Sequence, residues 1–190
     1  MTQETREEAR RVRFVPLTKE AMEFLRDSDT ASAGAVAGVE LPDYFVTEEA
    51  RWLWGYRLGQ IEEDPAQAPW VVRQAVVGED GNVVGHAGFH GPPDADGMVE
   101  VAYSVVPAYR RRGYARAMLA ELLRRAGADP AVRTVRAAIS PDNAGSLATV
   151  APFGFVHTGE QWDEIDGREL LLELDLEDLE QRGDERTGTA

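Results

Sequence analysis

The sequence predicts an α+β protein in which a mixed, mostly antiparallel sheet is flanked by helices. The apolar side chains follow a helical spacing from Ala50 to Ile61, alternate from Trp70 to Val106, and return to a helical spacing after Gly113. Two Asp-Gly steps, at 80–81 and 166–167, separate alternating segments and indicate hairpin turns. At 190 residues the chain is long enough for one sizeable core.

The N-terminal part of the chain is predicted to be one short strand followed by helices. Residues 12–17 are the strand candidate, and Thr18 is a helix N-cap. Residues 31–38 have small side chains and are compatible with a loop or a helix. Trp52 lies off the apolar stripe of the helix that begins after Thr47, so it either covers a neighbouring element or lines a pocket, and we favour packing in the core. That stripe is Ala50, Leu53, Trp54, Leu58 and Ile61.

The remaining elements alternate between strands and helices. One domain is expected over residues 11–176, with flexible tails at 1–10 and 177–190. Pro152 lacks a backbone N–H and should end the second helix of this region early. The predicted elements are strands at 70–77, 82–90, 98–106, 133–139, 155–162 and 168–176, a long helix after Gly113 and a short helix from Asp142.

The net charge, the absence of cysteine and the absence of long apolar runs limit the classes of function that the chain could have. The net charge is −14 and the pI about 4.6, so the field of the protein should repel nucleic acid. The acidic surface either serves only to keep the protein soluble, which is the interpretation we favour, or also attracts a cationic partner. The chain has no cysteine, which excludes disulfides, thiolate metal sites and a cysteine nucleophile. It has neither a secretory signal nor an apolar run of about 20 residues, so we expect a cytoplasmic protein without a membrane partner, as a monomer or homodimer.

The most informative segment runs from the strand at 98–106 through Pro107 into a helix near Gly113. In such a strand–loop–helix unit, backbone N–H groups and the positive end of the helix dipole converge on one point, which suits a pyrophosphate. Gly113 allows close backbone approach or a positive φ. Three consecutive arginines, at 110–112, can add positive charge or can simply be solvated.

The same segment resembles a known family. Arg110-x-x-Gly113-x-Ala115 is similar to the signature of the Gcn5-related N-acetyltransferases, whose loop amides hold the pyrophosphate of coenzyme A. A second patch, Asn143 to Ser146 followed by the Gly154-Phe155 step, resembles the next helix and strand of that family. The resemblance implies a single-domain acyl-CoA N-acyltransferase fold with acetyl-CoA as co-substrate and no metal.

The resemblance also implies which residues contact the cofactor. Val105 would pair with the pantetheine arm and point its N–H at the thioester oxygen. Asn143 and Ser146 would lie beside the distal part of the arm, and Ser146 could act as a general acid. The full set of implied cofactor residues is Ser104, Val105, Val106, Arg110, Arg111, Arg112, Gly113, Tyr114, Ala115, Arg116, Asn143 and Ser146.

Finer features relate the chain to one branch of the family and separate it from another. Glu100 to Tyr103, the tyrosine at 109 and the Asn143/Ser146 pair look like the branch that contains ribosomal-protein N-terminal acetyltransferases. Many relatives carry a tyrosine seven residues after the asparagine as general acid, but this chain has Val150 there. The general acid is therefore Ser146 or a water molecule.

The chemistry expected of such a site requires a base. An alkylammonium with a pKa near 10.4 is only about one part in 2500 neutral at pH 7, a cost of about 4.6 kcal/mol before it can attack. Glu100 shares a strand face with Ala102 and Ser104 and is the base candidate, although it could equally be a surface glutamate paired with arginine. His86 and His90 share a face of the preceding strand and could also accept protons.

Two alternatives to acetyl transfer remain open from the sequence. The donor could be a larger acyl-CoA, such as succinyl-CoA. The protein could also be a regulatory module that binds coenzyme A without catalysis. The acceptor is expected to be a primary amine, either a small molecule or a protein N-terminus.

Overall fold

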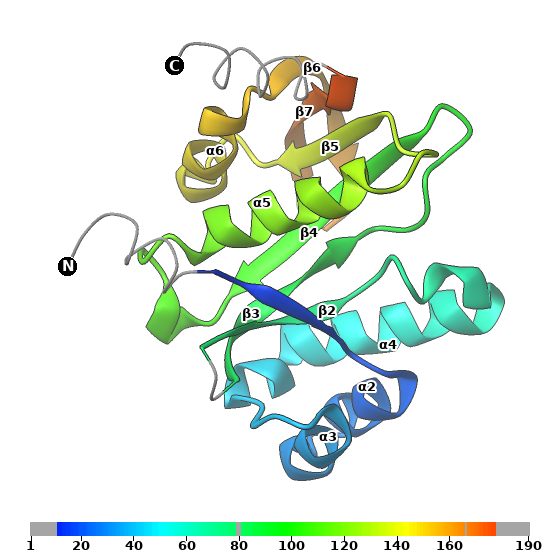
Figure 1. The fold of residues 1–190 in the computed structure, drawn as a ribbon, viewed down its shortest axis with the longest axis vertical. Coiled ribbons are helices and arrows are strands. Elements are labelled where there is room, and N and C mark those ends of the chain that lie inside the picture. The colour runs from blue at the N-terminus through cyan, green and yellow to red at the C-terminus, as the bar shows by residue number, and fades with distance from the viewer. Residues whose placement is uncertain (1–10, 79–80, 166, 178–190) are drawn as a thin grey trace, which may run out of the picture. The chain divides into compact units, whose positions relative to one another are not determined.

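A computed structural model describes residues 11–78, 81–165 and 167–177. The predicted tails, apart from Glu177, and the centres of both Asp-Gly turns lie outside the described residues. All seven strands assigned in the structure belong to one sheet of order β1-β2-β3-β4-β5-β7-β6 (Figure 1). Their bounds are β1 Arg13–Pro16, β2 Arg73–Val77, β3 Asn82–Phe89, β4 Met98–Val105, β5 Thr134–Ile139, β6 Val156–Asp163 and β7 Gly167–Asp175.

The pairing of the strands confirms the predicted mixed, mostly antiparallel sheet. β4 and β5 pair in parallel, whereas β1–β2, β2–β3, β5–β7 and β6–β7 are antiparallel. Strand β2 begins three residues later than predicted. The amides of Trp70 and Val71 both donate to Gln67 O, so these two residues form a turn before the strand.

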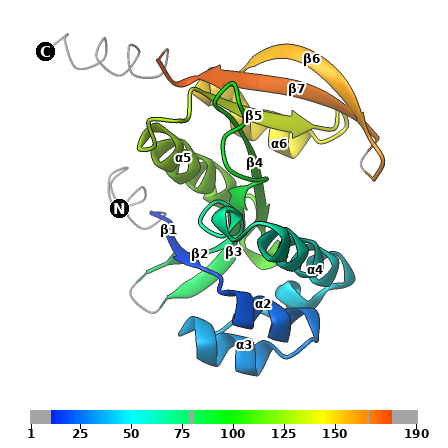
Figure 2. The same ribbon diagram turned by 90° about the vertical axis from the view of Figure 1, so that its right-hand side faces the viewer.

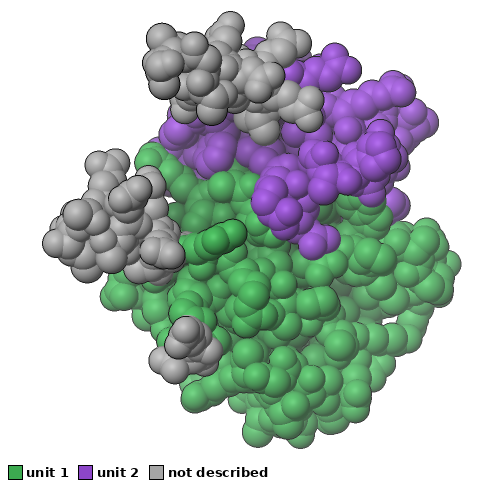
Figure 3. Space-filling model, in the orientation of Figure 1, with its two compact units in different colours: residues 1–89, 103–121 green, residues 90–102, 122–190 purple. Residues whose placement is uncertain are grey.

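The chain divides into two compact units, which are coloured separately in Figure 3. Unit 1 comprises residues 1–89 and 103–121. Unit 2 comprises residues 90–102 and 122–190. Strand β4 and helix α5 (Tyr114–Gly127) each contribute residues to both units.

Three helices of unit 1 lie on the same side of β1–β3 (Figure 2). They are α2 (Lys19–Arg26), α3 (Thr30–Ala37) and α4 (Glu48–Glu63). The predicted cap at Thr18 is present, and Thr47 caps α4 in the same way, since each accepts a hydrogen bond from the amide three residues later. The ambiguous segment at 31–38 is helical because Asp29 caps its start and Gly38, with φ of 71°, ends it.

Helix α4 supplies the largest side chain of the unit 1 core. Trp54 is fully buried, packs against Phe45 at 5.6 Å between ring centroids, and donates its indole N–H to Phe45 O. The prediction that Trp52 packs in the core is wrong, because its side chain is 57% exposed and stacks on Tyr56. Two residues along a helix turn a side chain by about 200°, so Trp52 and Trp54 point in nearly opposite directions.

Unit 2 contains the C-terminal strands and the short helix α6 (Ala144–Val150). Asn143 caps α6 by accepting a hydrogen bond from the amide of Ser146 at 3.0 Å. The helix ends at Val150 and continues as a 3₁₀ turn over Ala151–Phe153, as expected from Pro152.

Candidate functional site

The strand–loop–helix segment predicted from the sequence is formed, and its central part, residues 103–121, belongs to unit 1. β4 runs into the 3₁₀ turn Pro107–Tyr109, and α5 follows. Both Arg111, with φ of 57°, and Gly113, with φ of 89°, adopt left-handed backbone conformations. Left-handed residues occur in loops whose backbone N–H groups bind anions, and the first-turn amides of a helix have no acceptor within the helix.

The arginines of this loop have different surroundings. Arg110 donates from Nε to Val105 O at 3.1 Å, and its guanidinium lies 5.9 Å from the centre of the Tyr44 ring. Arg112 lies over the Tyr109 ring at 5.6 Å. Arg110 therefore holds the end of β4 to the loop, whereas the exposed side chains of Arg111 and Arg112 carry the positive charge at the surface.

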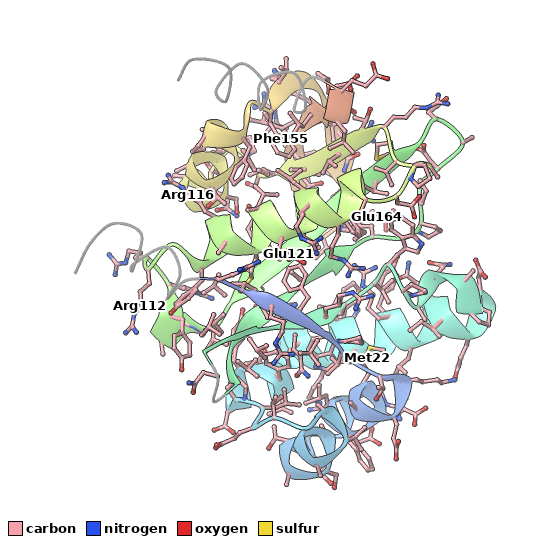
Figure 4. The ribbon with its side chains drawn as sticks, viewed as in Figure 1. Met22, Arg112, Arg116, Glu121, Phe155 and Glu164 are labelled. Atoms are coloured by element: carbon pink, nitrogen blue, oxygen red, sulfur yellow. The ribbon has the colours of Figure 1, made fainter. Side chains whose placement is uncertain are left out.

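The other predicted cofactor residues of unit 1 continue this segment on both sides. Val106 is buried, and its N–H donates to Val84 O at 2.9 Å, which keeps the end of β4 beside β3. Arg112, in the loop, and Arg116 and Glu121, on α5, are labelled in Figure 4. Tyr114 and Ala115 begin the helix and are half-buried.

Ser104 on β4 belongs to a cluster that the sequence did not reveal. Its hydroxyl shares a 2.7 Å hydrogen bond with Tyr44, which lies in the 3₁₀ turn Asp43–Val46. The Tyr44 ring also stacks on His86 with ring centroids 6.5 Å apart. No motif in the sequence marks Tyr44, because its partners come from strands more than 40 residues away.

Aromatic side chains surround His86. The Phe45 and Trp54 rings meet the imidazole edge to face at 5.5 and 5.1 Å. Burial is the main cause that lowers the pKa of His86 to about 4, and the nearby Arg57 guanidinium adds to the effect. His86 is therefore neutral at pH 7 and, among the histidines considered as bases, is poorly suited to accept a proton.

Gln74 faces His86 across the β2–β3 pairing. Its side chain is fully buried, and neither amide atom has a hydrogen-bond partner among the described residues. A buried carboxamide without partners is costly. Gln74 and His86 thus place polar atoms on the face of β2 and β3 that α4 covers.

In unit 2, Glu100 lies opposite His90. The His90 N–H donates to Glu100 O at 2.8 Å, and His90 Nδ1 lies 3.4 Å from Glu100 Oε1. On the other side of Glu100, the parallel pairing of β4 with β5 places Arg136 in the same row, and Arg136 forms an ion pair with Glu173 at 2.6 Å. The four side chains form an alternating row of basic and acidic groups.

The second predicted patch lies on α6, also in unit 2. The carboxamide oxygen of Asn143 is engaged as the helix cap, and Ser146 is half-buried in the first turn. Val150 occupies the position where many relatives have a tyrosine, and it is buried in the core. The neighbouring Thr149 hydroxyl donates to Gly145 O, so it is engaged within the helix.

The described residues contain neither a cluster of metal-ligating side chains nor a helix that could span a membrane. Within 11–78, 81–165 and 167–177, no group of three or more His, Cys, Asp or Glu side chains is placed to hold a metal ion. In the same part of the chain, the helices are too short or too polar to cross a bilayer.

The strand, the arginine-rich loop and the helix follow one another in the order that the sequence resemblance predicted. Residues 22–155, most of the chain, match the model of the acetyltransferase (GNAT) family. The chain belongs to this family, as the sequence motifs predicted.

Individual relatives agree with this assignment. The uncharacterized N-acetyltransferase YjdG of Bacillus subtilis strain 168 is 34% identical over 74 residues, which are 39% of this chain and 44% of YjdG. This chain therefore spans less than half the length of that relative. The alignment supports the family, and the activity of the whole relative is not carried over.

Solved structures of the family share the fold. The spermidine/spermine N-acetyltransferase SpeG of Vibrio cholerae superposes with a TM-score of 0.62 at 13% identity, covering 90% of this chain and 98% of SpeG. RimJ of Mycobacterium smegmatis, in complex with CoA-disulfide, has a TM-score of 0.59 at 17% identity, covering 88% and 87% of the two chains. These matches confirm the predicted acyl-CoA N-acyltransferase fold.

Proposed function

We propose that the protein transfers the acetyl group of acetyl-CoA to a primary amine by direct attack of the amine on the thioester. The observation that carries this proposal is the loop before α5, where Arg111 and Gly113 take left-handed conformations and exposed arginines gather in a chain of net charge −14. The family membership of the chain and the coenzyme A derivative bound by RimJ support the same cofactor.

The residues present fit coenzyme A. The loop amides and the first turn of α5 would hold the pyrophosphate, and Arg111, Arg112 and Arg116 would add charge at its solvent side. Ser104, Val105 and Val106 would line the arm, with the Val105 N–H directed at the thioester oxygen. When bound, acetyl-CoA supplies an activated acyl group.

The chain's own groups would then manage the protons. Glu100, alone or with a neighbouring group, would assist removal of the proton from the acceptor ammonium. Asn143 and Ser146 would lie by the distal part of the arm, with Ser146 or water as the acid for the leaving thiolate. An amine acceptor is supported by the names of relatives such as SpeG, and a protein N-terminus by the branch that the Glu100 to Tyr103 segment resembles.

Two steps test the proposal. Calorimetry with acetyl-CoA and with free coenzyme A should show binding by the parent, and Gly113→Val should weaken it by at least about 100-fold. A valine side chain both resists the positive φ and blocks the approach of phosphate to the backbone. Gly127→Val at the end of α5, away from the loop, is the matched control and should bind as the parent does.

Turnover is measured next, as release of free thiol from acetyl-CoA in the presence of spermidine, benzylamine or an alanyl tetrapeptide. Release with at least one amine supports the proposal. Parent protein that binds neither acetyl-CoA nor coenzyme A at millimolar concentration contradicts it. Faster turnover of succinyl-CoA would instead favour a larger acyl donor, and binding without turnover of either would favour a regulatory module.

A further inference from the structure

His90 and Glu100 are held face to face by the backbone as well as by their side chains. The His90 N–H donates to Glu100 O at 2.8 Å, so the two residues are directly opposite across an antiparallel pairing. The imidazole Nδ1 lies 3.4 Å from Glu100 Oε1. The exposed fractions of the side chains differ, at 55% for His90 and 18% for Glu100. The carboxylate is thus the sheltered partner, and the ring extends from it toward solvent.

Other charged groups near this pair come from the adjacent strands and the following loop. Arg136 on β5 stands next to Glu100 in the parallel pairing, and Glu173 on β7 binds the Arg136 guanidinium through Nε at 2.9 Å and Nη2 at 2.6 Å. Asp94, in the loop after His90, accepts hydrogen bonds from the amides of Asp96 and Met98. The positive charge of Arg136 is paired with Glu173. Glu100 is the carboxylate that lies 3.4 Å from His90 Nδ1.

The two candidates for proton acceptor differ in basicity. An ordinary imidazole, with a pKa of about 6.5, binds a proton about 100-fold more tightly than an ordinary glutamate carboxylate, with a pKa of about 4.3. A general base works best when its pKa is close to the working pH. A carboxylate that accepts the Nδ1–H of a histidine fixes the tautomer in which Nε2 carries the lone pair, and stabilises the imidazolium that forms.

We propose that His90 is the general base for the acceptor amine and that Glu100 is the carboxylate that orients it. This inference rests on the proposed acetyl transfer. In the step, an N–H bond of the acceptor ammonium breaks and an Nε2–H bond of His90 forms, directly or through one water. The Nδ1–H bond of His90 stays intact and continues to face the Glu100 carboxylate. The neutral amine attacks the thioester, and the imidazolium later releases its Nε2 proton to solvent, which restores the starting tautomer. Glu100 is a positioning residue in this scheme.

The experiment compares the parent with His90→Gln, Glu100→Gln and His157→Gln, using acetyl-CoA and whichever amine of the panel the parent acetylates fastest. His90→Gln should lower kcat at pH 7 by about 10²–10⁴-fold, with the KM for acetyl-CoA within about twofold of the parent. The acid limb of the parent's kcat profile should fall in the range of an imidazole and should be absent from His90→Gln. His157 lies exposed on β6, so His157→Gln should match the parent.

A second measurement does not depend on turnover. The chain has only three histidines, so the His90 ring can be followed by NMR as the pH is changed. Its titration should move to lower pH in Glu100→Gln, because a negative charge that favours the imidazolium has been removed. In the parent, the midpoint of this titration should coincide with the acid limb of kcat/KM, since kcat/KM reports the protonation of the free enzyme.

Two results would overturn the inference. One is a His90→Gln enzyme within about threefold of the parent with a parallel pH profile. The other is a His90 titration that does not respond to Glu100→Gln. This second result can be obtained even if no amine is acetylated. Circular dichroism and acetyl-CoA binding check that each variant is folded. If His90→Gln does not fold, His90→Asn takes its place. Failure of the parent to bind acetyl-CoA contradicts the proposed function, whereas turnover that ignores His90 contradicts only this inference.

Discussion

His86 and His90 are four residues apart, and strand alternation assigns them to one face, yet their surroundings differ in every respect that governs protonation. His86, in unit 1, is enclosed by the rings of Tyr44, Phe45 and Trp54, and burial lowers its pKa to about 4. His90, in unit 2, is 55% exposed and lies beside the carboxylate of Glu100. The comparison shows that strand position alone does not assign a histidine to catalysis. The side chains that surround the imidazole decide whether it can accept a proton near neutral pH.

The largest effect of a substitution is expected at the pair of His90 and Glu100, and it is an effect on kcat. Glu100→Gln should lower kcat by about 10²–10⁴-fold at neutral pH. The loss should shrink as the pH approaches the pKa of the acceptor amine, because more of the amine is then already neutral. Acetyl-CoA affinity should change little. Because the two residues act as one unit, the His90→Gln/Glu100→Gln double variant should be hardly slower than the worse single variant. Losses that multiply in the double variant would show that the two residues act independently.

The second largest effect is expected in the aromatic surroundings of His86. Trp54→Ala should lower the free energy of unfolding by about 3–5 kcal/mol, since Trp54 is fully buried and bonded to Phe45 O. Trp52→Ala, on the exposed side of the same helix, is the matched control and should cost within about 0.5 kcal/mol. Urea unfolding measures both. Equal losses would contradict the placement of the two indoles on opposite sides of α4.

The third effect concerns the charge state of His86. The folded pKa lies below the unfolded value, so the unfolded state binds the proton first, and stability falls as the pH drops from about 6.5 toward 4. His86→Gln should remove this dependence, which is worth about 2 kcal/mol between pH 7 and pH 5 for a fully enclosed ring and less if water reaches it. His157→Gln should retain it. Parallel stability curves for the parent and His86→Gln would contradict the lowered pKa.

The smallest effect is expected at the edge of the His86 cluster. Tyr44→Phe removes the hydroxyl that bonds Ser104 and keeps the ring that stacks on His86. The free energy of unfolding should fall by about 1 kcal/mol, the usual worth of one hydrogen bond. Thermal unfolding measures the change. A larger loss, comparable to that of Trp54→Ala, would mean that the ring packing had been disturbed as well.

Much of the fold could be predicted because its signals are local. Thr18 acts as the predicted helix cap, α4 begins after Thr47 as predicted, and α6 ends just before Pro152. The start of β2 and the outward direction of Trp52 could not be predicted in the same way. Both depend on contacts that form only in the folded chain, a turn to Gln67 in one case and the choice of core face in the other.

The sequence by itself determined the family and located the loop that we propose binds the cofactor, because the motif of Arg110, Gly113 and Ala115 lies within one short segment. Only the tertiary structure decided which charges and rings meet around the candidate bases. The register of the consecutive strands β3 and β4 brings His90 opposite Glu100, and the register of β5 and β7 pairs Arg136 with Glu173, 37 residues further along the chain. The pKa of an ionisable group depends on burial and on the nearest charges. Those quantities are properties of the packed sheet, and residue spacing does not contain them.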